Sequence, residues 1–348
     1  MKLLIFWLFC FLMSLPCLSQ SRYHPETDPK FEEFFAQFTL VDSVIFDAPG
    51  LIIGQISHLA WFDNHAVIWD DRSDSMVAIG TDSKQWSVIS LADKLPGNTW
   101  SPVAHFFHPD LGYWLATFPS YYIKLNPNGI ETILNLQELP VDGKITVSQD
   151  GHLYIIQNPS PQKSELVKVD IVSQNIVSRF ILPVPAEYQA FAYRATGYGG
   201  IAVDRNDRIY YANPVENRVY CLNQSGQVID ILKSKHKSYK MMPKNNKLNS
   251  NPQAILQYML QTRPDMIADI RLFGSNLLVR YSIDRRLYIE LFDLESGESI
   301  FGKAIKVPYV FRTTVGNRIC LCKTPAYDTI EDPNAIPNPK ILVYRYGQ

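Results

Sequence analysis

The stretch "GGIAVDRNDRIYYANPVENRVYCLNQSGQVIDIL", from Gly199 to Leu232, decides the fold predicted for this chain. Short apolar runs alternate in it with polar turns. "GIAV" and "RIYYA" flank a turn at Arg205 to Asp207, "RVYCL" follows a turn at Pro214 to Asn217, and "QVIDIL" follows a turn at Gln224 to Gly226. This pattern predicts four antiparallel strands joined by three hairpins. One such sheet cannot cover both of its own faces, so it must stack against others like it.

Similar units occur on both sides of this stretch. "KITVSQDGHLYIIQ" from Lys144, "ADIRLFGSNLLVRYS" from Ala268 and "FRTTVGNRICLC" from Phe311 repeat the order of strand, polar turn and strand. Weaker copies begin at Ile56 and Val103. The units recur at a spacing of roughly 45 residues, which is typical of four-stranded propeller blades. The sequence therefore predicts an all-β protein, a six-bladed β-propeller of four-stranded antiparallel blades.

The fourth unit also resembles a known repeat. Its stretch "GGIAVDRNDRIYYANPVENRVYCLNQSGQVI" is similar to an NHL repeat, and the chain as a whole resembles six-bladed propellers of exported bacterial families. The resemblance is closest in the fourth unit and least close in the first two. It implies the propeller fold. It also implies two enzyme types to consider, which are calcium- or zinc-dependent lactonases or esterases and metal-dependent lyases.

The two ends of the chain fit closure of such a ring. The last unit is one strand short, and "FTLVDSVIF" from Phe38 to Phe46 can supply that strand. Just before it, "TDPKFEEFFAQF" predicts a short helix, with Asp28 as its cap and Pro29 at its first position. The predicted organisation is a signal peptide at 1–19, an extension with a short helix at 20–37 and the propeller at 38–348.

The first residues, "MKLLIFWLFCFLMSLPCLSQ", have the composition of a signal peptide. Lys2 precedes an apolar run from Leu3 to Leu15, which is too short to span a membrane, and cleavage is expected after Ser19. Alternatively, "SLPC" is a lipobox and Cys17 carries a lipid anchor. Either reading predicts an exported protein that is periplasmic, attached to the cell envelope or secreted. The net charge of -1 argues against nucleic acid as a partner.

One segment interrupts the repeat between blades 4 and 5, and we expect a helical insertion at 233–263. It carries six lysines between Lys233 and Lys247, followed by a helix with Asn251 as its cap and Pro252 at its first position. A loop of this length has a use or is disordered. It is either a solvated insertion or a lid or docking arm. In the second case its lysines meet an anionic partner and Met241 and Met242 supply apolar contact.

Candidate ligand-binding residues lie on the innermost strands, which converge at the central channel of a propeller. Asp269 and Arg271 are two residues apart and project to the same side of their strand. They form either a structural ion pair between blades or a site for an anion or carboxylate. The channel candidates are His58, His105, Lys144, Asp269, Arg271 and Arg312.

A metal site is the alternative for the same region. His58 and His105 begin consecutive units, and with Asp269 they could bind Ca²⁺ or Zn²⁺. Against this, no acidic residue recurs at one blade position, and histidines at the channel wall also bond to backbone.

Familiar catalytic patterns such as G-x-S-x-G and H-E-x-x-H are missing. The sequence therefore favours an exported, non-catalytic propeller without a cofactor, which binds a small ligand or an envelope protein at its channel face. A metal-dependent lactonase or esterase-type hydrolase or lyase and a purely structural role in the envelope are the alternatives.

Overall fold

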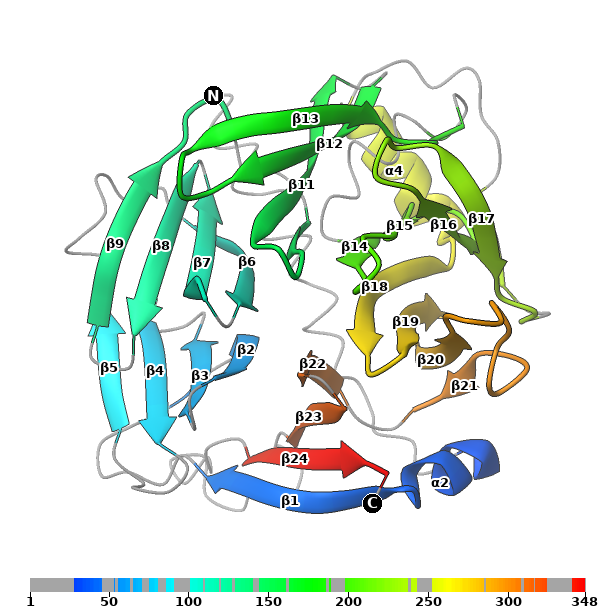
Figure 1. Cartoon of the computed structure of the whole chain (residues 1–348). Helices are drawn as coiled ribbons and strands as arrows, with labels where there is room; N and C mark the ends of the chain where they lie inside the picture. Colours follow the sequence, from blue (N-terminus) through cyan, green and yellow to red (C-terminus); the bar gives the residue numbers. More distant parts are fainter. Residues whose placement is uncertain are drawn as a thin grey trace.

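A computed structural model of the chain describes most of the propeller. Its residues are 28–45, 53, 56–62, 65–70, 75–80, 86–90, 101–108, 110–118, 120–126, 129–139, 144–160, 163–185, 188, 198–236, 239–242, 252–284, 286–307, 310–315, 317–323 and 340–347. Within these residues the strands form six four-stranded antiparallel sheets, arranged around an axis as the blades of a propeller (Figure 1). The predicted fold class is confirmed. The predicted signal peptide lies outside the described residues.

In blades 1 to 5 the strands follow one another in the sheet as they do in the chain. Blade 1 contains β2 (Ile56–Phe62), β3 (His65–Asp70), β4 (Ser75–Gly80) and β5 (Trp86–Ser90). Blade 2 contains β6 (Ser101–His108), β7 (Gly112–Phe118), β8 (Tyr121–Asn126) and β9 (Gly129–Asn135). Blade 3 contains β10 (Ile145–Val147), β11 (His152–Ser160), β12 (Lys163–Asp170) and β13 (Asn175–Ile181). Blade 4 contains β14 (Gly200–Val203), β15 (Ile209–Ala212), β16 (Arg218–Leu222) and β17 (Val228–Lys233). Blade 5 contains β18 (Met266–Phe273), β19 (Asn276–Ile283), β20 (Arg286–Asp293) and β21 (Ile305–Lys306).

Blade 6 joins the two ends of the chain. It contains β22 (Val310–Val315), β23 (Arg318–Lys323), β24 (Lys340–Tyr346) and, as its outermost strand, β1 (Phe38–Ile45). β1 pairs with β24 along its whole length, from Phe38 opposite Tyr346 to Ile45 opposite Lys340 (Figure 1). The predicted closure by the N-terminal strand is therefore confirmed.

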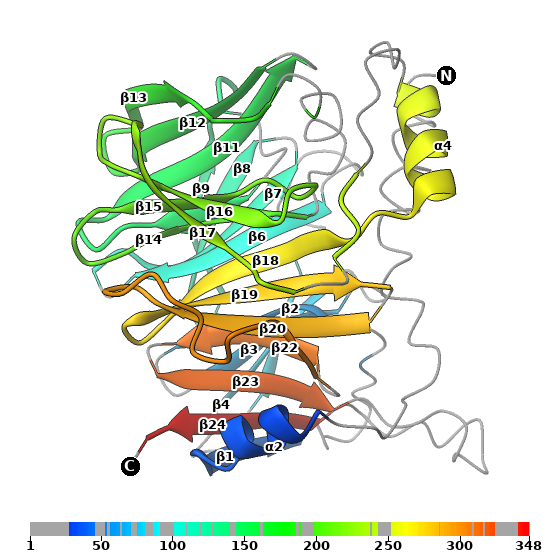
Figure 2. The same ribbon diagram turned by 90° about the vertical axis from the view of Figure 1, so that its right-hand side faces the viewer.

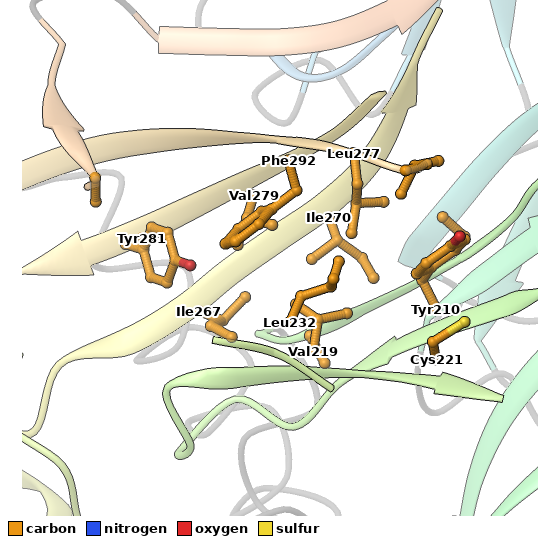
Figure 3. Close-up of a cluster of buried hydrophobic side chains, with 14 of the residues drawn as sticks. Tyr210, Val219, Cys221, Leu232, Ile267, Ile270, Leu277, Val279, Tyr281 and Phe292 are labelled. Carbon is orange, nitrogen blue, oxygen red and sulfur yellow. The ribbon is translucent and has the colours of Figure 1, made fainter. Parts of the chain in front are cut away.

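The first strand of each blade lies nearest the axis. These strands contact one another around a closed ring, in the order β2, β6, β10, β14, β18, β22 and back to β2. The apolar faces of neighbouring blades pack together, as Ile270 and Leu277 of blade 5 do against Val219 and Tyr210 of blade 4 (Figure 3). This stacking hides both faces of each sheet, and it brings six separate chain segments to the axis.

The N-terminal helix forms as predicted. Helix α2 (Pro29–Phe35) begins after Asp28, whose carboxylate accepts a hydrogen bond from the Lys30 backbone N–H at 3.0 Å. Phe31 and Phe34 are buried, and the Phe34 ring packs edge-on against Phe301 beside blade 5, with ring centroids 4.7 Å apart. The helix thus holds the entry of β1 against the propeller.

Helix α4 (Pro252–Thr262) follows β17 and precedes β18, and it lies off one face of the ring (Figure 2). Its buried side chains, Ile255 and Met259, pack with Met242 and Val215. Met242 is 1% exposed, so it cannot supply the apolar contact to a partner that the sequence suggested, whereas Met241 is 38% exposed. The full extent of the insertion stays a prediction, because residues 243–251 lie outside the described part.

The described cysteines are inert thiols rather than disulfides. Cys221 and Cys320 are buried and free. Burial raises the pKa of both thiols, to about 12 for Cys320, which keeps them protonated. The side chain of Cys322 lies outside the described part. Over the same residues, no helix is long and apolar enough to cross a lipid bilayer.

Two valines on β1 test the closure of the ring. Val44 is 1% exposed and packs in the cluster between blades 6 and 1, whereas Val41 on the same strand is 39% exposed. We expect Val44→Ala to lower the free energy of unfolding by about 2 kcal/mol, because it leaves a cavity in that cluster. Val41→Ala, the matched control, is expected to change it by less than about 0.5 kcal/mol. Equal effects in denaturant titrations would contradict this role of β1.

Candidate functional site

Three of the six channel candidates come together near the axis. Asp269 and Arg271 lie on β18, and the Arg271 Nε donates a hydrogen bond to the Asp269 Oδ2 at 2.7 Å. Lys144 lies just before β10 in blade 3, and its charge also acts on Asp269. A fourth residue, Arg280 of β19, completes the cluster. We call Lys144, Asp269, Arg271 and Arg280 the axial cluster.

A glycine in the strand between blades 3 and 5 makes this approach possible. A Cβ on Gly200 of β14 would lie 2.8 Å from the backbone nitrogen of Ile270 and 3.5 Å from the Asp269 Oδ1. Any other residue would push β14 away from β18. Backbone hydrogen bonds fix the same contact, since the Gly199 N–H donates to the Ile267 carbonyl at 2.8 Å. β14 therefore lies close against the strand that carries the carboxylate.

The surroundings of Asp269 stabilise its charged form. Burial alone would raise the pKa of this carboxyl group, but the three cations around it outweigh that effect and hold the pKa at about 2. For Lys144, burial lowers the pKa, the nearby arginines lower it further, and Asp269 opposes them. One carboxylate thus faces three cationic side chains, so the axial cluster carries an excess of positive charge.

Sequence reasoning missed Arg280, although the hairpin contains the signal that finds it. The turn at Gly274 and Ser275 places Phe273 opposite Asn276, and counting back along both strands places Asp269 opposite Arg280. Directly opposed residues of an antiparallel pair project to the same face. The predicted channel residues lie on innermost strands, whereas Arg280 belongs to the second strand of its blade.

Of the three remaining candidates, only His105 has a described side chain. The side chains of His58 and Arg312 lie outside the described part, although their strands β2 and β22 are placed. The His105 ring lies beside Tyr113 of the same blade, with ring centroids 6.1 Å apart.

His108 has a structural role of the kind expected for some histidines. Its Nδ1 accepts the Asp110 backbone N–H at 3.1 Å, so the Nε2 carries the proton and donates to the Gln149 carbonyl at 2.8 Å. It therefore ties a turn of blade 2 to a turn of blade 3.

Asp204 supports its turn. Its Oδ1 accepts the backbone N–H of Asn206 at 2.8 Å and of Arg208 at 2.9 Å, and its Oδ2 accepts the Arg208 Nε at 2.7 Å. This carboxylate is occupied by the hairpin, so it is not a candidate ligand group.

No set of three His, Cys, Asp or Glu side chains among the described residues is placed to hold a metal ion. The alternative set of His58, His105 and Asp269 includes a side chain outside that part, so it stays a prediction. Asp269 already forms an ion pair with Arg271. A metal there would have to compete with three cations for one carboxylate.

The comparisons with known proteins concern the fold. No known protein-family model matches the chain, and no curated protein matches it in sequence. A protein from Bacteroides fragilis that is inferred to be exported matches with a TM-score of 0.55 and 11% identity, over 90% of this chain and 96% of that one. Virginiamycin B lyase from Staphylococcus aureus matches with a TM-score of 0.47 and 13% identity, over 86% of this chain and 82% of that one. At 11% identity, the Bacteroides fragilis match shows a likeness of fold alone, and the resemblance to NHL repeats stays a prediction.

The charge of Asp269 predicts an acid-dependent stability. Its folded pKa of about 2 lies below the ordinary value of 3.8, so its contribution of about 2 kcal/mol is present above about pH 4 and is lost as the pH falls through about 2. We expect Asp269→Asn to be less stable than the wild type at pH 7, and the difference to shrink below about pH 4.

Denaturant titrations between pH 7 and 2 measure this difference. Asp110→Asn, a change at an exposed carboxylate in the turn between β6 and β7, is the control and should show a small effect at every pH. A deficit of Asp269→Asn that stays constant down to pH 2 would show that the carboxylate is not held by the surrounding cations.

Proposed function

We propose that this protein is an exported, non-catalytic propeller that binds an anionic ligand, through a carboxylate or similar group, at the axial cluster. One observation carries the proposal: Arg271 bonds to Asp269 at 2.7 Å, and the charges of Lys144 and Arg280, from blades 3 and 5, act on the same carboxylate. Three cations gathered around one carboxylate attract a further anion.

The cluster is also accessible and suited to a carboxylate. The Arg271 side chain is 31% exposed, whereas the Asp269 side chain is 11% exposed. A guanidinium binds a carboxylate through paired, parallel hydrogen bonds. We propose that the exposed part of the Arg271 guanidinium contacts the ligand while its Nε holds Asp269. Asp269 then acts as a positioning residue that orients the guanidinium.

Export rests on two lines of support. The first residues of the chain have the composition of a signal peptide, and the Bacteroides fragilis protein of similar fold is inferred to be exported. Cleavage after Ser19 leaves a protein free in the periplasm or the medium, whereas lipidation at Cys17 would attach it to the envelope. The intact mass of the exported protein distinguishes these two products, because only the second carries a lipid.

Ligand titrations of paired variants test the axial cluster. We expect citrate, a probe with three carboxylates, to bind the wild type at low ionic strength and to raise its melting temperature. Lys144→Gln/Arg271→Gln should weaken binding about 100-fold, because hydrogen bonds to charged groups are each worth about tenfold. The control, Lys233→Gln/Arg205→Gln, removes the same charge from exposed positions and should bind citrate as the wild type does. Equal binding by both double variants would contradict the proposed site.

Elemental analysis tests the absence of a metal. Protein purified without chelator should contain less than stoichiometric Ca²⁺ or Zn²⁺, and neither ion should change its melting temperature. A stoichiometric metal that is lost in His105→Ala would instead support the hydrolase or lyase alternative.

A further inference from the structure

A second concentration of positive charge lies away from the axis, beside the outer strands of blade 5. There the structure contains an open cleft of ≈ 990 Å³. Its walls come from three parts of the chain, which are residues 28–29 at the start of α2, residues of the segment 233–263 on both sides of α4, together with Asp265, and blade 5 itself. The N-terminal extension and the segment around α4 therefore meet at this cleft.

The cleft is held in shape by a buried carboxylate. Asp265, which is 5% exposed, accepts the Lys240 backbone N–H at 2.6 Å through Oδ2 and the Asp284 backbone N–H at 2.8 Å through Oδ1. The Lys240 Nζ donates to the Thr262 carbonyl at 2.6 Å. These bonds connect the insertion to the turn between β19 and β20, so the cleft exists before any ligand arrives.

Charge in the cleft is unbalanced. Five cations and three carboxylates line it, and Asp265 and Lys240 are occupied by the bonds above. The four remaining cations, Arg263, Arg286, Lys303 and Lys306, have no ion pair with any residue that the structure describes. Asp28 and Asp284 are the two remaining carboxylates of the lining, so the cations exceed the carboxylates by two and the cleft attracts an anion.

An imidazole adds a second observation at the same place. The His236 ring stands edge-on to the Tyr288 ring, with centroids 5.2 Å apart, and both residues line the cleft. The His236 Nδ1 is buried and has no hydrogen-bond partner within the described structure. A buried polar atom without a partner is costly, and a rotation of the ring that exposes this nitrogen would let an oxygen atom of a ligand accept its hydrogen bond when the nitrogen carries the proton.

We propose that this cleft is a second binding site, separate from the axial cluster, for a small multiply charged oxyanion that carries phosphate or carboxylate groups. Arg263, Arg286, Lys303 and Lys306 supply the charge, and His236 contributes a hydrogen bond. The lysine-rich run from Lys233 to Lys247 was the reason to expect an anionic partner. However, Lys235 of this run pairs with Glu298 at 3.1 Å outside the cleft. The arginines and lysines of the cleft lie mostly outside that run.

Calorimetric titration of the full chain tests this site with two probes, inorganic pyrophosphate and citrate. We expect at least one probe to bind the wild type with a dissociation constant below about 1 mM at low ionic strength. Pyrophosphate alone would assign the site to phosphate groups, and citrate would assign it to carboxylates. Arg286→Gln/Lys306→Gln should weaken binding at this site about 100-fold.

Two controls separate this site from general charge effects and from the axial cluster. Lys340→Gln/Arg345→Gln removes the same charge from β24 in blade 6 and should bind the probes as the wild type does. Titrations in the Lys144→Gln/Arg271→Gln background should retain the event that Arg286→Gln/Lys306→Gln removes. Failure of both probes to bind, or binding that only the axial variants abolish, would overturn the proposal. Unfolding midpoints establish that each variant is folded.

Discussion

Pairing of β1 with β24 is the constraint on which the rest of this structure depends. A four-stranded sheet has two apolar faces, and each blade covers its own by lying between two neighbours. The ring is therefore stable only when it is complete. The outer strand of blade 6 comes from the beginning of the chain and its other three strands come from the end. Blade 6 therefore forms only when β1 pairs with β24. Val44 of β1 contributes directly to the cluster shared by blades 6 and 1, which makes this pairing part of the core. The pairing also covers the edge of β24, so that β1 is the outer edge of blade 6.

Completion of the ring determines the chemistry available at its axis. Six first strands are forced together there, and the crowding is severe enough that position 200 between blades 4 and 5 admits only a glycine. The space left by that missing side chain adjoins the Asp269 carboxylate, which Lys144 of blade 3 reaches electrostatically. Charged groups so close to one another, and largely withdrawn from water, interact far more strongly than they would at the surface. We propose that the excess of cations in this setting favours binding of an anion. Among the described residues, strand placement is what brings these charges together.

The spacing of the apolar runs and the residues of the turns between them were sufficient to predict the architecture. The alternation around Gly199 to Leu232 located the four strands of blade 4, and the missing strand of the last unit pointed to the segment that begins at Phe38. The site was only partly accessible to the same reasoning. Asp269 and Arg271 could be linked because two-residue spacing determines the face of a strand, and Arg280 could have been added from the hairpin register. The proximity of Lys144, by contrast, depends on how far blade 3 lies from blade 5 across a narrow β14. No local pattern encodes that distance, since it results from packing around the whole ring.

The cleft beside blade 5 was even harder to predict from the sequence than the axial cluster. Its residues come from positions near 28, 236, 263, 284 and 306, and none of these short segments has a distinctive motif. Composition was misleading as well, because a net charge of -1 averages over a surface on which separate regions differ in sign. The lysine-rich run drew attention to the segment 233–263, yet its described residue Lys240 contributes a backbone N–H to Asp265, and the cationic side chains of the cleft come largely from blade 5. Blade 5 supplies Arg286, Lys303 and Lys306, the segment beside α4 supplies Arg263, and both contribute to the walls. A cleft built in this way exists only because the two segments outside the repeat pack against the same blade.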